Sequence, residues 1–134
     1  MSHFTKVKTK IKNLNRLKKI LQELDFSYEE SMETSNIKIR GWNKEETEVL
    51  LKIKTGGSYS IGVIKNKEGF YEFVADWWGV ETTSGLEQEN FINKITRQYA
   101  YTTIIEKIRK KGYDLVTEEV DDSQNIRLVV RRWE

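Results

Sequence analysis

The sequence predicts an α+β fold: an antiparallel sheet of about six or seven strands with two main helices packed on one face. Apolar and polar residues alternate with period two in several short runs, and two longer runs have helical spacing. These runs follow the order strand, helix, several strands, helix, two strands, which is typical of α+β domains. The 134 residues fall within the size range of one domain, so we expect a single domain over residues 1–134.

The N-terminal run predicts the first strand. Alternate positions hold Thr5, Val7, Thr9 and Ile11 on one side and Lys6, Lys8, Lys10 and Lys12 on the other. This pattern indicates a half-buried strand whose outer side is charged.

A helix is predicted after this strand. Asn13 can cap a helix from Leu14 to about Leu24, because leucines and one isoleucine form a stripe at helical spacing. No element is assigned to the acidic stretch 25–34, and a short strand is expected over Ile37–Trp42 before a charged turn at 44–46.

Three consecutive strands are expected in the middle of the chain. The runs Val49–Ile53 and Tyr59–Val63 flank Gly56-Gly57, a dipeptide that supplies the positive backbone angles of a hairpin turn. A second turn at 66–69 leads into Tyr71–Ala75, so the three strands form an antiparallel meander.

The C-terminal third predicts a long helix and a hairpin. The helical pattern runs from about Leu86 to Lys111, but its apolar residues change face near Gln98. The helix is therefore either buried broadly or bent at that point. The strands of the hairpin are expected at Tyr113–Val120 and Ile126–Trp133.

Scarce residues exclude several chemistries. The chain has no cysteine and one histidine, His3, which excludes disulfides, zinc-thiolate sites, iron-sulfur clusters and a cysteine nucleophile. We expect His3 to be a packed, hydrogen-bonded strand residue. We also expect no cofactor, no metal site and no enzymatic activity, and no apolar run is long enough for a membrane span. A carboxylate-dependent enzyme is kept as a hypothesis that ranks below the two binding functions described next.

Aromatic residues are the main indication of a binding surface. Trp77 and Trp78 are adjacent, so in an extended segment one would enter the core and the other would be exposed. The alternative is that both pack between sheet and helix. An exposed tryptophan could anchor a protein partner, and the candidates for that contact are Asp76, Trp77, Trp78 and Trp133.

Basic residues suggest an alternative function. Residues 1–20 contain seven Lys or Arg and no acid. An RNA-binding module could use such residues to follow phosphates, and the candidates for this basic patch are Lys6, Lys8, Lys10, Arg16 and Lys19.

Several strings of the sequence resemble a known family. They are Met1-Ser2-His3-Phe4, Ala75-Asp76-Trp77-Trp78-Gly79-Val80, Tyr99-Ala100-Tyr101 and Arg127-Leu128-Val129-Val130-Arg131-Arg132-Trp133. In these strings the chain resembles the family called hypothetical chloroplast open reading frame thirty-five, conserved proteins of unknown function from algal plastids and cyanobacteria. The resemblance implies residence in the plastid stroma, or in the cytoplasm if the source is cyanobacterial, and a link to photosynthetic electron flow. It implies no catalytic residues. We therefore expect an adaptor, assembly or regulatory factor that binds an unknown protein partner, with RNA binding as the alternative.

Overall fold

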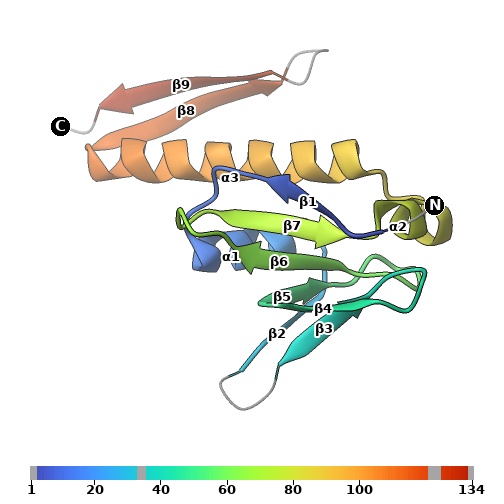
Figure 1. The fold of residues 1–134 in the computed structure, drawn as a ribbon. Coiled ribbons are helices and arrows are strands. Elements are labelled where there is room, and N and C mark those ends of the chain that lie inside the picture. The colour runs from blue at the N-terminus through green and yellow to red at the C-terminus, as the bar shows by residue number, and fades with distance from the viewer. Residues whose placement is uncertain (1–2, 33–35, 121–124, 133–134) are drawn as a thin grey trace. The chain divides into compact units, whose positions relative to one another are not determined.

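The computed structural model describes residues 3–32, 36–120 and 125–132, with the backbone alone at 114–120 and 132. Within these ranges it contains three helices and nine strands (Figure 1). The helices are α1 (Leu14–Glu23), α2 (Trp77–Ser84) and α3 (Gln88–Lys110). The strands are β1 (Thr5–Lys8), β2 (Tyr28–Glu30), β3 (Ile37–Arg40), β4 (Glu46–Val49), β5 (Leu51–Ile53), β6 (Ile61–Lys65), β7 (Tyr71–Ala75), β8 (Tyr113–Val120) and β9 (Ile126–Arg132).

The chain forms two compact units, Met1–Arg97 and Gln98–Glu134, and their boundary lies within α3. That boundary coincides with the position at which the apolar residues of the helix change face. The second unit contains the rest of α3 and the antiparallel β8–β9 hairpin, which confirms the expected hairpin. Trp133 lies outside the described residues.

The first unit contains a five-stranded antiparallel sheet in the order β1-β7-β6-β5-β2. Strands β5, β6 and β7 are the expected meander, and β1 extends it by pairing Thr5 with Ala75. The α+β class is confirmed. The seven described strands of this unit are divided between two sheets, because β3 and β4 form a separate pair.

The prediction of a single strand over Val49–Ile53 is wrong, because the chain passes from the β3–β4 pair to the five-stranded sheet at Leu50. Val49 pairs with Ile37 in the β3–β4 pair, whereas Leu51 pairs with Val63 in the larger sheet. Between them, the Leu50 amide donates to the Val63 carbonyl at 2.8 Å. The period-two alternation continues through this point, so the pattern alone does not reveal the break.

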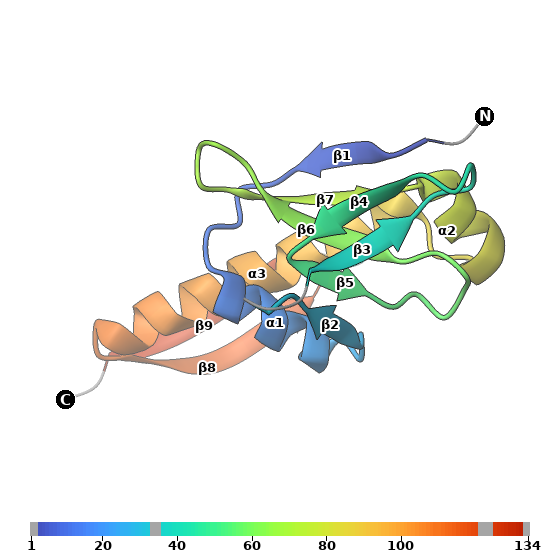
Figure 2. The same cartoon turned by 60° about the horizontal axis from the view of Figure 1, so that its bottom comes forward.

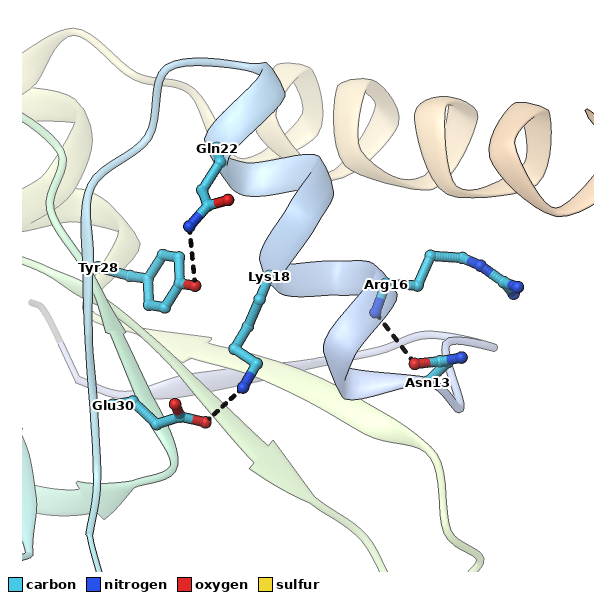
Figure 3. A network of polar contacts seen from close by, with 6 residues as sticks. All are labelled: Asn13, Arg16, Lys18, Gln22, Tyr28 and Glu30. Atoms are coloured by element: carbon cyan, nitrogen blue, oxygen red, sulfur yellow. Dashed lines mark hydrogen bonds and ion pairs between the residues drawn. The ribbon is translucent and has the colours of Figure 1, made fainter. Parts of the chain in front are cut away.

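One face of the larger sheet is covered by helices. Strand β2 joins this face to α1, because Lys18 donates to Glu30 at 2.8 Å and Gln22 donates to the Tyr28 hydroxyl at 3.4 Å (Figure 3). The beginning of α3 supplies Phe91, whose ring lies edge-on to that of Phe73 with 5.3 Å between their centroids.

Helix α1 begins as the sequence predicts. Asn13 is its N-cap, and the side-chain Oδ1 accepts from the Arg16 amide at 3.0 Å (Figure 3). The hydrogen bond donated to Glu30 raises the pKa of Lys18 above its ordinary 10.5, although burial acts in the opposite direction. The pair therefore stabilises the fold below the pKa of the unfolded state, and this contribution is lost as the pH rises through the folded pKa.

The opposite face of the sheet is covered by the β3–β4 hairpin, which Figure 2 shows in front of β6 and β7. Ile39, Val49 and Val74 form a buried cluster there, and partly buried residues surround it: Phe4, Ile37 and Ile64. Gly62 of β6 lies directly beneath Val49. A Cβ at Gly62 would overlap the Val49 side chain and lie 3.1 Å from Val74 Cγ1. The absence of a side chain at Gly62 therefore lets the hairpin approach the sheet.

We expect Gly62→Ala to destabilise the fold by about 1–3 kcal/mol, because an added methyl group overpacks this contact. Urea unfolding measures the change. In a Val49→Ala background the same substitution should cost less than half as much, because the truncation makes room for the new methyl group. An equal cost in both backgrounds would show that Val49 does not restrict residue 62.

Candidate protein-contact site

Asp76 connects β7 to helix α2 and is the centre of the candidate site. Its carboxylate is only 1% exposed, and it caps α2 by accepting from the Gly79 amide at 3.1 Å. The second carboxylate oxygen accepts from the Trp42 amide at 2.8 Å. One buried side chain thus holds together the start of α2 and the turn that follows β3.

The two adjacent tryptophans have different surroundings. The extended conformation in which the two side chains would point to opposite sides is not formed, because Asp76 caps α2 and Trp77 and Trp78 are its first two residues. Trp77 is 6% exposed and its indole Nε1 donates to the Thr5 carbonyl at 3.2 Å, whereas Trp78 is 49% exposed. The alternative in which both pack inside is therefore wrong.

Trp78 belongs to an exposed aromatic cluster that also contains Trp42 and Tyr59. The Trp42 ring, 52% exposed, lies edge-on to Trp78 with 4.7 Å between centroids. The Trp42 ring also stacks near the Tyr59 ring, with a centroid distance of 6.3 Å and an interplanar angle of 27°. Three rings from separate segments therefore form one surface, which we call the aromatic cluster.

The backbone beneath the aromatic cluster is closely packed. A Cβ at Gly79 would lie 3.0 Å from the Tyr59 ring, and one at Gly57 would lie 2.5 Å from Thr83 Oγ1. The Thr55 hydroxyl donates to the Tyr59 carbonyl at 2.5 Å. The loop that holds Tyr59 is thus seated directly on α2, which restricts the position of the ring.

The structure separates the predicted partner-binding residues. Trp78 is accessible, whereas Asp76 and Trp77 are buried and position the surface instead of forming it. The sequence reasoning missed Trp42 and Tyr59. One signal could have found Trp42: the alternation of Ile37 and Ile39 reaches residue 41, so Trp42 is out of phase with the strand and belongs to the turn.

The predicted basic patch is not one surface. Lys6 and Lys8 are paired with Val74 and Glu72, so their side chains lie on the hairpin side of the sheet. Arg16 and Lys19 lie on α1, which packs on the other side. Lys10 lines a shallow depression with Lys8. His3, expected to be packed, is exposed.

No helix in the described part of the chain has the length and apolar composition that a membrane crossing requires.

A family model described as "Protein of unknown function (DUF1257)" matches residues 20–129. The chain belongs to this family. Curated relatives extend the match to nearly the whole chain. A protein named "Uncharacterized protein ycf35" from Cyanophora paradoxa is 35% identical over 99% of this chain and 98% of its own. Proteins of the same name from Pyropia yezoensis and Guillardia theta are 35% and 33% identical, with the same coverage. The resemblance identified from the sequence strings is thereby confirmed. No solved structure matches the chain.

We expect Asp76→Ala to destabilise this DUF1257 protein by about 2–4 kcal/mol, because α2 loses its cap and the Trp42 amide loses its acceptor. Asp76→Ser is the matched variant, since a serine can still cap α2 but lacks the second oxygen. Asp76→Ser should therefore lose only about half as much free energy of unfolding as Asp76→Ala. Urea unfolding gives the free energies, and tryptophan emission reports whether the aromatic cluster has opened. Losses below about 0.5 kcal/mol in both variants would contradict this role for Asp76.

Proposed function

We propose that this chain is a non-enzymatic plastid protein, an adaptor or an assembly or regulatory factor, that acts by contact with a protein partner. The observation that carries this proposal is the exposed aromatic cluster. Trp42 and Trp78 are each about half exposed, although burying such rings is favourable. Tryptophan and tyrosine are enriched among the residues that dominate binding energy at protein interfaces.

The rigidity of the aromatic cluster supports the same function. A partner that binds preformed rings loses little side-chain entropy, since each aromatic side chain has two rotatable angles and these are already restricted. Here Asp76 fixes the backbone at Trp42 and Gly79, and Gly79 in turn packs against Tyr59. The rings are therefore suited to bind without first rearranging.

The relatives support the proposed location. The ycf35 proteins that match nearly the whole chain come from algae. We place the protein in the plastid stroma, or in the cytoplasm if its source is a cyanobacterium, and the family resemblance suggests a role connected with photosynthetic electron flow.

Affinity capture from a plastid extract tests the proposal. We expect a partner retained by the unmodified protein to fall at least about tenfold in Trp42→Ala and in Trp78→Ala, because truncating a central interface tryptophan typically costs 2 kcal/mol or more. Quantitative mass spectrometry of the captured proteins provides the measurement.

Met32→Ala is the matched control, because it removes another exposed apolar side chain, 69% accessible, outside the aromatic cluster. Its partners should equal those of the unmodified protein. Identical partner sets for folded Trp42→Ala, Trp78→Ala and the unmodified chain would show that the aromatic cluster is not the contact surface. Binding of single-stranded RNA at low salt, with no captured protein, would favour the nucleic-acid alternative.

A further inference from the structure

Strand β1 is an outer strand of the five-stranded sheet. It pairs with β7 on one side, and no strand in the described part of the chain pairs with its other side. In Figure 2, β1 forms the upper edge of the sheet. Such an edge presents a row of backbone N–H and C=O groups that can pair with another chain.

The hydrogen-bond pattern shows which backbone groups face outward. The Tyr71 amide donates to the Ile11 carbonyl at 2.9 Å, and the Tyr71 carbonyl accepts from the Thr9 hydroxyl at 2.6 Å. The N–H and C=O groups of odd-numbered residues of β7 therefore point toward β1. On β1 they form hydrogen bonds with the backbone of Thr5 and Val7. Because pairing alternates along an antiparallel ladder, the N–H and C=O groups of Lys6 and Lys8 face outward.

The same two residues also set the charge of this edge. The Lys6 and Lys8 side chains are exposed and lie on the hairpin side of the sheet. Lys8 also lines a depression together with Lys10 and Lys67. Two acidic residues line the same depression. Glu68 is exposed, whereas Glu72 is only 6% exposed and its carboxylate accepts from Asn66 Nδ2 at 3.0 Å.

The other side of β1 carries the opposite charge. Val7 lies in a depression together with three acidic side chains: Glu81 of α2, Glu87 of the connection that follows α2, and Glu89 of α3. A strand placed beside β1 would therefore meet lysines on one face and glutamates on the other. Successive side chains of a strand point to opposite faces, so alternate residues of an incoming segment face opposite charges.

We propose that the outer edge of β1 binds an extended segment of a partner protein, which adds to the sheet as a sixth, antiparallel strand. The residues opposite Lys6 and Lys8 are acidic, and the residue opposite Val7 is basic or uncharged. Backbone hydrogen bonds hold the segment in place, while the alternating charges select it.

Two other occupants fit less well. A second copy of β1 would place lysines against lysines, and like charges directly opposite each other are destabilising. A single-stranded RNA would match the lysines but not the three glutamates on the other face, and it would leave the outward backbone groups without their strand partner. The edge therefore favours a protein segment with alternating charge.

Hydrogen exchange followed by NMR tests whether the edge is available. In the protein alone, the Lys6 and Lys8 amides should exchange at least about tenfold faster than the Val7 amide, which is bonded to β7. Slow exchange of Lys6 and Lys8 in the protein alone would show that the edge is already covered and would overturn the proposal.

A labelled peptide tests the occupant. In this peptide, glutamates alternate with lysine or threonine. It should bind the full chain in a fluorescence anisotropy titration, and its binding should slow the hydrogen exchange of the Lys6 and Lys8 amides. Binding should weaken about fivefold or more in the double variant Lys6→Glu, Lys8→Glu, because two opposite-charge pairs become like-charge pairs. It should also weaken as the salt rises from about 50 mM to about 500 mM.

Matched controls separate strand addition from simple charge attraction. The double variant Lys19→Glu, Lys54→Glu makes the same charge change elsewhere and should bind the peptide as the unmodified protein does. Methylating the alternate peptide nitrogens that face β1 should abolish binding, because it removes the donors to β1, whereas methylating the other alternate set should not. Equal loss in both double variants, or undiminished binding of the peptide methylated on the nitrogens that face β1, would overturn the proposal. So would binding of an oligouridylate that depends on Lys6 and Lys8 without binding of the peptide.

Discussion

The burial of both faces of β7 is the constraint on which the first unit depends. All five residues of this strand are buried. Phe73 meets Phe91 on the helix side, and Val74 packs with Ile39 and Val49 on the hairpin side. A strand buried on both sides needs two covering layers, so neither the helices nor the β3–β4 hairpin can be removed without exposing apolar surface to water.

The aromatic cluster follows directly from this buried strand. Asp76 is the residue after β7, so its carboxylate is held by the most buried strand of the sheet. Because its two oxygens accept from Trp42 and Gly79, segments far apart in the sequence meet at one point. Buried polar groups are stable only when they are hydrogen-bonded. Satisfying this one carboxylate therefore fixes the backbone that carries the exposed rings.

Local patterns predicted the elements whose apolar residues repeat with a clear period: the meander, the final hairpin and α1 with its Asn13 cap. They did not predict β2, which lies in an acidic stretch and gains its place by pairing with β5. Helix α2 was missed because its eight residues contain no apolar stripe, although Asp76 and Gly85 mark its ends. The site depends on tertiary contacts, so sequence spacing could suggest Trp78 but could not bring Trp42 and Tyr59 beside it.

The pairing of β1 with β7 also has a consequence for the order of folding during synthesis. Thr5 pairs with Ala75, so β1 waits for its partner strand until roughly 70 further residues have been added. At about 5–20 residues per second, this delay lasts on the order of 4–14 s. The helix-side core is completed later still, because it needs Phe91. The lysines of β1 are suited to keeping the nascent strand soluble while its partner is still being made.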